Sequence, residues 1–174
     1  MNSQSVKVRS AIKNEMEVYF DAISRNESFA RVAVAAFVTH LNPTLEELAD
    51  VKTAVSEAVT NAIIHGYENF AGYGKFGEQA STMPRNPGKV RLKCVLDGDV
   101  LHIEIEDKGR GIENIEQAME PLFTTKAELE RSGMGFAFME AFMDDLEVES
   151  VPEEGTIIRM KKKLGASAWI ECEE

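Results

Sequence analysis

Cysteine, long apolar runs and basic charge are all scarce in this chain, and each scarcity excludes a class of protein. The two cysteines, Cys94 in a strand-like stretch and Cys172 near the end, are too few and too badly placed for a disulfide framework. The longest apolar run, residues 32–38, is far shorter than the roughly 20 residues of a membrane span, and the first residues contain no apolar signal core. We expect a protein of the reducing cytoplasm that is neither exported nor inserted into a membrane.

The deficit of basic residues argues against a nucleic-acid partner. The chain has 19 Lys and Arg against 30 Asp and Glu, for a net charge of −11. Such a field repels a phosphate backbone, so direct contact with nucleic acid is not expected. We interpret the acidic surplus first as a solubility feature, with a basic protein partner as the alternative.

Length and patterning predict one domain of the α+β class. The 174 residues match a single core of roughly 100–200 residues. The pattern predicts an edge strand (14–24), a helix from Asn26 or Ser28 to about 41, a helix from Asn42 to Gly66, a loop insert (70–89), a hairpin (90–105, turning at Asp97-Gly98), a helix (134–143) and a hairpin (146–164, turning at 152–155). Helices and strands fall in separate runs, which favours helices on one face of a mostly antiparallel sheet.

Three polar residues interrupt an otherwise apolar helix at residues 54–68. Glu57, Asn61 and His65 follow one another at four-residue steps and therefore form one stripe along the helix. The Asn61 amide oxygen suits Mg²⁺, and Glu57, one turn away, could accept a proton. The alternative is a hydrogen-bonded polar stripe without chemistry, and for His65 we favour a structural role at the helix end.

Two glycine-containing motifs are each weak when taken alone. Asp107, Gly109 and Gly111 come directly after a strand, where the carboxylate could accept a hydrogen bond from an exocyclic amine, although an ordinary turn is the alternative. Gly133 and Gly135 precede an apolar helix, whose free amides suit phosphate.

A third glycine pattern is a false match. Residues 72–77, G-Y-G-K-F-G, fit the dinucleotide-binding pattern letter for letter, but no strand precedes them and no helix follows. The sequence also lacks the P-loop motif and the H-R-D motif of ordinary protein kinases.

The motifs occur together in an order that resembles one ATPase superfamily. E-x-x-x-N in a helix, D-x-G-x-G after a strand, G-x-G before a helix and a late Gly155-Thr156 resemble the GHKL, or Bergerat-fold, ATPases, which include gyrase and the histidine kinases. The stretches N-E-S-F-A-R-V-A-V-A-A-F-V, V-S-E-A-V-T-N-A-I-I-H-G-Y-E, P-L-F-T-T-K-A-E-L-E-R-S-G-M-G-F and M-E-A-F-M-D-D look like the anti-sigma-F family of spore-forming bacteria.

This resemblance implies a domain organisation and a fold. It runs from about Asn14 to Leu164, so we expect an ATPase/kinase domain over 14–164, built as a two-layer α/β sandwich of the Bergerat type. The departures from the family are a variable N-terminal extension (1–13), the insert at about 70–89, which we expect to be an exposed excursion, and an acidic C-terminal tail (165–174).

The resemblance also implies roles for individual residues. Glu57 would be the general base toward a serine hydroxyl, Asn61 would coordinate Mg²⁺, and Asp107 would bind adenine N6. The full set of ATP-binding residues that it implies is Asn61, Asp107, Gly109, Gly111, Thr124, Thr125, Lys126, Arg131, Gly133, Met134, Gly135 and Thr156. Arg31 matches the family's partner-binding position, and a solvated helix residue is the alternative.

The function implied is that of a homodimeric anti-sigma factor and kinase. Such a protein binds a sporulation sigma factor of the sigma-F type, blocks its use by RNA polymerase, and uses Mg-ATP to phosphorylate an anti-anti-sigma factor on serine. Two alternatives stay open, a non-catalytic nucleotide-gated binding module and a general-stress (sigma-B type) serine kinase. A histidine-kinase ATPase domain is disfavoured, because no dimerising helical hairpin with a phosphoacceptor histidine is present.

Overall fold

A five-stranded antiparallel sheet forms one layer of the molecule. The structure is a computed structural model and describes residues 13–67, 88–120 and 134–165. The strands are β1 (Lys13–Asp21), β2 (Lys89–Asp97), β3 (Val100–Asp107), β4 (Asp145–Val151) and β5 (Gly155–Lys163). They lie in the order β1-β2-β3-β5-β4, with every neighbouring pair antiparallel. The predicted edge position of the first strand is confirmed.

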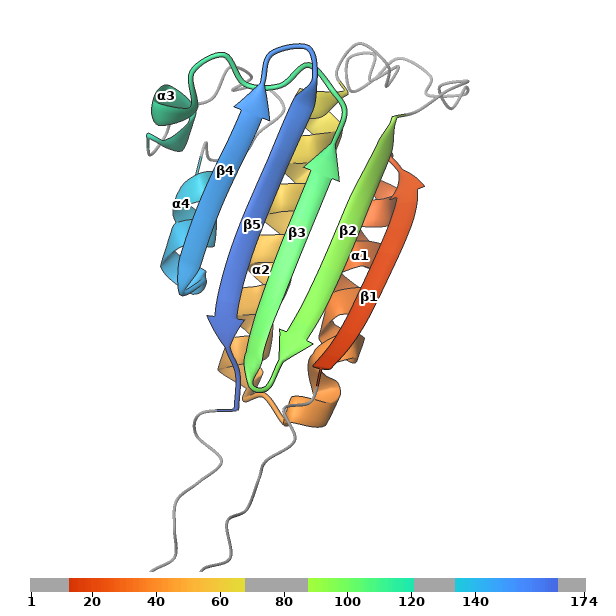
Figure 1. Ribbon diagram of the computed structural model, residues 1–174, viewed down its shortest axis with the longest axis vertical. Coiled ribbons are helices and arrows are strands. Elements are labelled where there is room, and N and C mark those ends of the chain that lie inside the picture. The colour runs from red at the N-terminus through yellow and green to blue at the C-terminus, as the bar shows by residue number, and fades with distance from the viewer. Residues whose placement is uncertain (1–12, 68–87, 121–133, 166–174) are drawn as a thin grey trace, which may run out of the picture.

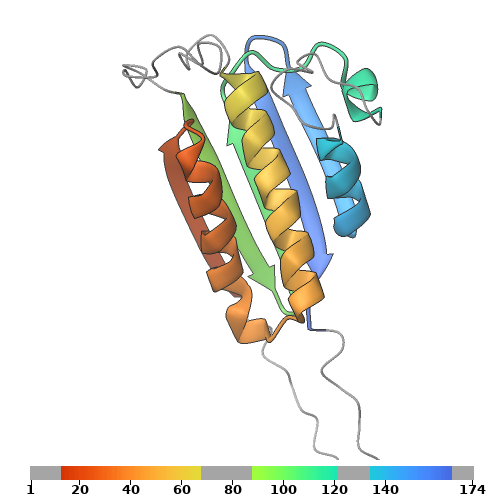
Figure 2. The same ribbon diagram turned by 180° about the vertical axis from the view of Figure 1, so that it is seen from behind.

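The helices form the second layer and cover one face of the sheet (Figures 1 and 2). They are α1 (Arg25–Val38), α2 (Leu45–Asn61), the short α3 (Ile115–Met119) and α4 (Gly135–Phe142). A 3-10 turn (Thr39–Leu41) follows α1, and a π-helical turn (Ala62–Gly66) continues α2. This arrangement confirms the predicted two-layer α+β fold.

The core lies between the two layers because apolar residues alternate along the strands. In β2 the four inward-facing residues Val90, Leu92, Cys94 and Leu96 are completely buried. Helix α2 crosses the middle of the sheet and buries a stripe that includes Ala54, Ala58 and Val59. Small side chains on this stripe let the α2 backbone lie close to the sheet, which brings the polar residues of the same helix near the strand ends.

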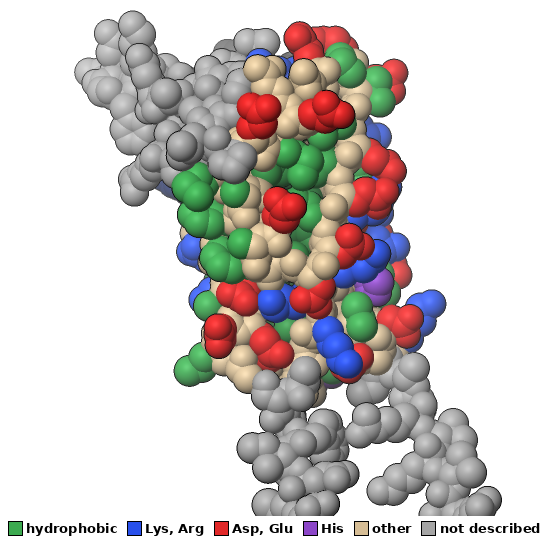
Figure 3. Space-filling view, turned by 90° about the vertical axis from the view of Figure 1, so that its left-hand side faces the viewer, with side chains coloured by type: hydrophobic (Ala, Val, Ile, Leu, Met, Phe, Trp, Pro, Cys, Tyr) green, Lys and Arg blue, Asp and Glu red, His purple; other side chains and the backbone are tan. Residues whose placement is uncertain are grey.

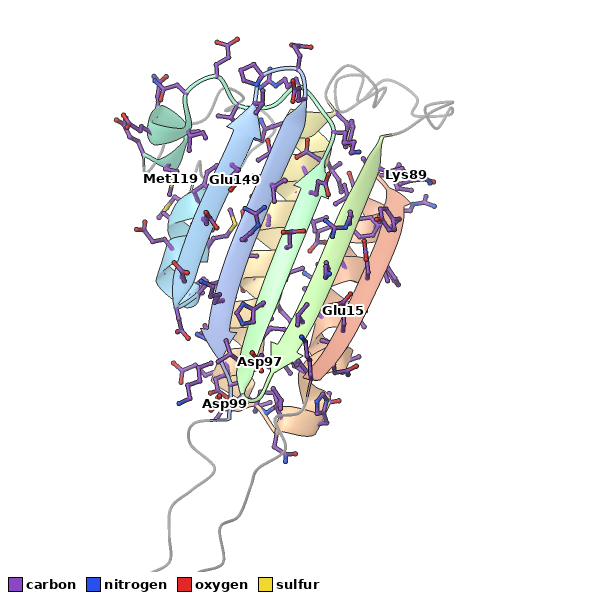
Figure 4. The ribbon with its side chains drawn as sticks, viewed as in Figure 1. Glu15, Lys89, Asp97, Asp99, Met119 and Glu149 are labelled. Carbon is purple, nitrogen blue, oxygen red and sulfur yellow. The ribbon has the colours of Figure 1, made fainter. Side chains whose placement is uncertain are left out.

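The opposite face of the sheet is open and carries charged side chains, as Figure 4 shows with Glu15 and Glu149 on strands at its two edges. Arg91 binds Glu17, Glu104 and Glu106 at 2.5, 2.6 and 2.9 Å. Arg159 continues this network by binding Glu104 at 2.8 Å and Glu149 at 2.9 Å. The charged side chains of this open face are therefore largely paired with one another.

The starts of two helices differ from the prediction. Helix α1 begins at Arg25 with Ser24 as N-cap, ahead of both predicted caps. Helix α2 begins at Leu45, because the Thr44 hydroxyl accepts from the Glu47 amide and Glu47 reaches back to the Thr44 amide in a capping box. Asn42, the predicted cap, instead ends the 3-10 turn in the left-handed conformation at φ 50°.

The other differences concern turns and short segments. The hairpin loop between β2 and β3 consists of Gly98 and Asp99, one residue beyond the prediction, with Gly98 at φ +64°. The predicted insert ends earlier, because Lys89 opens β2, and α3 lies between the first hairpin and the helix at 134–143, where the pattern predicts no element. The remainder of the insert, residues 68–87, lies outside the described residues, as do 1–12 and 166–174. The second hairpin turns at 152–154, as predicted.

Membrane insertion through a helix finds no support in the described parts of the chain. Within residues 13–67, 88–120 and 134–165, no helix combines the length and the apolar character that a membrane span needs.

Candidate functional site

The first part of the site is the place where the C-terminal half of α2 meets the N-terminus of α4. Glu57 and Asn61 are partly exposed on α2. A Cβ atom built on Gly135 would lie 3.1 Å from Glu57 Oε2 and 3.4 Å from both Asn61 Oδ1 and Nδ2. The structure therefore brings together three residues that the sequence predicted from separate motifs. The absence of a side chain at position 135 keeps the space in front of the carboxylate and the amide open.

Helix α4 is held in this position by its other end. The Lys162 ammonium, 13% exposed on the inner face of β5, donates to the Phe142 carbonyl at 2.6 Å and pairs with Asp50 of α2 at 3.0 Å. A cation at the C-terminus of a helix is favourable because the helix dipole is negative there. This contact ties α2, α4 and β5 together, and it leaves the positive end of α4 directed toward Glu57 and Asn61.

Helix α2 ends in the π-helical turn, which contains His65 and Gly66. A Cβ atom on Gly66 would lie 2.7 Å from Asp107 Oδ1, so glycine is required where the turn approaches this carboxylate. Turns of this kind are frequent at functional sites. His65 stands in the last turn of the helix, at the structural position predicted for it.

Asp107 ends the inward-facing series of β3. Leu101, Ile103, Ile105 and Asp107 alternate on the buried side, and Asp107 is 6% exposed. Its Oδ1 accepts from the Gly109 amide at 2.9 Å. Burial raises the pKa of the Asp107 carboxyl to about 6, and the amides of Gly109 and Thr156 offset only part of that rise. A buried acceptor that is readily ionised at neutral pH is suited to an amine donor.

The glycines of the D-x-G-x-G motif are needed for close backbone approach. A Cβ on Gly109 would lie 2.0 Å from the Gly66 carbonyl oxygen, and the Arg110 amide donates to that oxygen at 2.9 Å. Gly111 has φ +68° and faces the Val151 carbonyl, where a Cβ would lie at 2.2 Å. The two glycines thus lock the loop after β3 between the end of α2 and the β4–β5 turn.

Thr156 lies beside Asp107 and has a partner that the sequence did not reveal. The two residues are directly paired across β3 and β5, and Thr156 is 8% exposed. Its hydroxyl lies 2.9 Å from the Ser150 hydroxyl, which also accepts from the Ile112 amide at 2.8 Å and donates to the Gly155 carbonyl. Polar side chains thus form a row across β3, β5 and β4 at one end of the sheet.

Tyr67 is a second residue that sequence reasoning missed. It is 4% exposed, and its hydroxyl donates to the Lys89 carbonyl at 2.6 Å and accepts from the Lys108 amide at 2.7 Å. No motif marks it, because its partners lie 22 and 41 residues away in the sequence. Its position directly after the conspicuous polar stripe was the only available signal.

Arg31 lies on α1, apart from the other predicted site residues. It pairs with Glu27 at 3.2 Å, and Glu27 in turn accepts from the Ser56 hydroxyl of α2. Ser56 directly precedes Glu57. Arg31 also lies 3.5 Å from the Ser56 hydroxyl, at the edge of α1 that faces α2. Phe29, 50% exposed, packs against Phe20 of β1 and therefore lies on the other side of α1.

Five of the predicted ATP-binding residues belong to a segment that the structure does not describe. Thr124, Thr125, Lys126, Arg131 and Gly133 lie outside the described residues, whereas Met134 is the N-cap of α4. Figure 3 shows the side of the molecule that carries α4 and β4, where apolar and acidic side chains share the surface.

The described residues form no all-protein metal cage: within 13–67, 88–120 and 134–165, no three His, Cys, Asp or Glu side chains are grouped to hold a metal ion. Two hard oxygen donors lie beside the open space at Gly135, the Asn61 amide oxygen and the Glu57 carboxylate. Cys94 is no candidate nucleophile, since burial raises the pKa of its thiol to about 12.

Comparison with known proteins shows the family to which this chain belongs. Residues 22–162 match the model of the histidine kinase-like ATPase domain. The chain is 52% identical over 156 residues to the anti-sigma F factor of Bacillus subtilis (strain 168), covering 90% of this chain and 97% of that protein. It is 53% identical over 153 residues to the anti-sigma F factor of Thermoanaerobacter sp. (strain X514), covering 88% of this chain and 96% of that one.

Solved structures support the same fold at lower identity. The crystal structure of the RsbU and RsbW domains of a Mycobacterium tuberculosis protein matches with a TM-score of 0.55 and 16% identity, over 87% of this chain and 32% of that one. The buried aspartate at the end of β3, the glycine loop beside the end of α2 and the helix N-terminus facing Glu57 thus occur in a chain that belongs to the histidine kinase-like ATPase family and, within it, to the anti-sigma F factors.

Proposed function

We propose that this protein is an ATP-dependent serine kinase and anti-sigma factor that acts in the cytoplasm on protein partners. The observation that carries the kinase assignment is the approach of the α4 N-terminus to Glu57 and Asn61, with Gly135 in contact distance of both. This arrangement supplies a base, a metal ligand and free backbone amides around one space. Phosphoryl transfer requires chiefly such positioning and charge neutralisation.

The nucleotide would extend from the end of β3 to α4. Asp107 would accept from the adenine amine, with Gly109, Gly111 and Thr156 forming the surrounding wall. The first-turn amides of α4 would contact the phosphates, since N–H groups at a helix start have no intrahelical partner. We propose that Thr124, Thr125, Lys126, Arg131 and Gly133 complete the phosphate contacts together with Met134 and Gly135.

In the proposed reaction Glu57 is the general base that accepts the proton of the partner's serine hydroxyl. The partner's serine oxygen forms a bond to the γ-phosphorus of ATP as the bond from that phosphorus to the bridging oxygen breaks, leaving ADP. Glu57 accepts the serine proton and later releases it to water. Mg²⁺, held through Asn61 and the phosphates, would neutralise phosphate charge. Asn61 fits this use because its amide oxygen is a hard ligand beside the open space at Gly135.

The partner assignment rests on the relatives. Proteins that cover almost the same length at 52–53% identity are named anti-sigma F factors, which favours a sigma factor of the sigma-F type over a general-stress sigma factor. We propose that Arg31 contributes to the surface that binds this sigma factor and the anti-anti-sigma factor. We also propose a homodimer and a functional domain over residues 14–164.

The kinase assignment is tested with purified protein, Mg-ATP and the anti-anti-sigma partner. Glu57→Gln should lower the rate of phosphate transfer to serine by roughly 100-fold or more, because general-base catalysis contributes about 10²–10⁴-fold. Glu46→Gln, an exposed carboxylate on the same helix, is the matched control and should transfer at the wild-type rate. Equal rates in wild type and Glu57→Gln would exclude this residue as the base, and absence of transfer in wild type would leave a nucleotide-gated binding module.

The partner surface is tested by capture of sigma-F type and sigma-B type factors on immobilised protein. Arg31→Ala should weaken capture of the sigma-F type factor roughly tenfold or more, as expected for a central interface arginine. The control is Arg25→Ala, which removes an exposed arginine from the first turn of the same helix. Equal capture by both variants would contradict the assignment of Arg31, and preferential capture of a sigma-B type factor by the wild type would contradict the choice of partner.

A further inference from the structure

We propose that Tyr67 is a positioning residue for Asp107 and thereby determines how strictly the site selects adenine. The proposal rests on the nucleotide-binding function proposed above and extends it to the choice of base. The groups involved are the Tyr67 hydroxyl, the adjoining ends of β2 and β3, and the Asp107 carboxylate at the end of β3.

The hydroxyl of Tyr67 lies where the β2–β3 ladder would otherwise continue. The last pair of that ladder is Val90 with Asp107. The next residues in register are Lys89 and Lys108, and the Tyr67 hydroxyl bridges them, donating to the Lys89 carbonyl at 2.6 Å and accepting from the Lys108 amide at 2.7 Å. One side-chain oxygen thus replaces a direct backbone hydrogen bond and holds the strand ends apart. Figure 4 shows Lys89 at this end of β2.

The separation of these strand ends sets the position of the residue next to Lys108. Asp107 directly precedes the amide that Tyr67 holds, and its carboxylate faces the end of α2. A Cβ on Gly66 would lie 2.7 Å from Asp107 Oδ1, so there is little room for the carboxylate to move on the helix side. Two adjacent residues thus restrict Asp107: Gly66 packs against its carboxylate, and Tyr67 holds the backbone amide of the next residue, Lys108.

The Tyr67 ring is itself fixed by packing. A Cβ atom on Gly88 would lie 2.0 Å from Tyr67 Cε1 and 2.2 Å from Cδ1, so glycine is required opposite the ring. The ring is buried and the hydroxyl has backbone partners from two strands. The hydroxyl therefore has one well-defined position, and it holds the Lys108 backbone in a fixed place next to Asp107, as a directional hydrogen bond from an amine to the Asp107 carboxylate requires.

Loss of the hydroxyl leaves two backbone groups without their bridge. In Tyr67→Phe, the Lys108 amide and the Lys89 carbonyl either stay unpaired at a cost or approach each other and extend the ladder by one pair. In both outcomes the Lys108 backbone, which directly follows Asp107, loses the contact that holds it in place. Adenine presents an amine to the carboxylate, whereas hypoxanthine presents a carbonyl at the same position, so recognition of adenine is the step that depends on how precisely Asp107 is held.

The experiment measures the dissociation constants of ADP and IDP by calorimetry for the full chain. We expect wild type to prefer ADP, and Tyr67→Phe to bind ADP roughly 5- to 10-fold more weakly, which corresponds to one hydrogen bond, with IDP changed less than about twofold. Gly88→Ala, which displaces the ring but keeps the hydroxyl, should change the two affinities in the same way. Tyr19→Phe is the matched control, because it removes a tyrosine hydroxyl that binds Glu17 at 2.7 Å on the exposed side of β1.

Each outcome gives a decision. Reduced discrimination in Tyr67→Phe and Gly88→Ala, with the Tyr19→Phe control unchanged, supports the proposal. Equal weakening of ADP and IDP, or unchanged discrimination, overturns it and leaves Tyr67 with a structural role while the proposed kinase function stands. Failure of the wild type to bind either nucleotide would overturn the proposed function and this inference together.

Discussion

Glu104 and Asp107 lie on opposite faces of β3, and their surroundings shift the pKa of the carboxyl group in opposite directions. Burial raises the pKa of Glu104, but hydrogen bonds from Arg159 and Arg91 outweigh it, so that the pKa is lowered. Burial also raises the pKa of Asp107, and two backbone amides fail to compensate, so that the pKa reaches about 6. On the open face Glu104 is paired with two arginines, whereas on the helix-covered face Asp107 has only backbone amides as the causes that lower its pKa. Cationic partners thus distinguish Glu104, which is part of the ion-pair network, from Asp107, the carboxylate that we propose to bind the nucleotide.

The largest effect is expected from filling the open space at Gly135, in front of Glu57 and Asn61. Gly135→Ala places a methyl group 3.1 Å from Glu57 Oε2, and we expect a roughly 10- to 100-fold slower phosphate transfer because small displacements of reacting groups have large effects. Stability should be unchanged or slightly higher, since alanine is the better helix former. Steady-state transfer and thermal unfolding measure the two effects.

Gly98→Ala is the matched control for that substitution. Position 98 has no neighbour within 4 Å but has φ +64°. We therefore expect the reverse result, with stability lowered by about 1 kcal/mol and transfer unchanged. A Gly135→Ala variant that loses stability instead of rate would contradict the assignment of Gly135 to the site.

The second prediction concerns the pH dependence of stability. The folded pKa of Asp107, about 6, is higher than the ordinary value of 3.8, so the folded state binds the proton more tightly than the unfolded state does. Ionisation therefore destabilises the fold as pH rises from 4 through 6, and the penalty is complete above that range. Asp107→Asn should raise the free energy of unfolding by about 1–3 kcal/mol at pH 7.5 and by almost nothing at pH 4. Denaturant unfolding at the two pH values measures this difference.

The same variant should lose its preference for ADP over IDP, since the amide no longer offers a charged acceptor. A gain in stability that is equal at both pH values would show that the buried charge is not its cause. Glu106→Gln, one position earlier on the open face, is the control and should retain the preference.

The smallest effect is expected on the open face. Arg91→Met leaves Glu17, Glu104 and Glu106 without their shared cation. Because the pairs are partly exposed, we expect Tm to fall by only roughly 2–4 °C, with phosphate transfer unaffected. The difference from wild type should shrink in 1 M NaCl, which screens exposed charges. A large loss of transfer would mean that the two faces of the sheet are coupled.

Most of the fold was predictable because the strands alternate and are joined by short turns. The alternation of Leu101, Ile103 and Ile105 assigns Asp107 to the buried side once it is extended by two residues. Helix starts were less accurate, although the Thr44–Glu47 capping box is visible in the sequence as T-x-x-E. Local signals thus compete, because Asn42 is also a plausible cap, but the Thr44–Glu47 box is the one that forms.

The sequence by itself determined the class of fold, the family and the conspicuous residues of the site, because each of these depends on local spacing or on motif order. Only the tertiary structure decided which residues meet. The approach of Gly135 to Glu57 joins residues that are 78 positions apart in the sequence. The Tyr67 and Ser150 hydroxyls bind backbone groups of distant strands and loops. These contacts follow from how α2 lies across the sheet, and nothing in the local pattern of either partner specifies them.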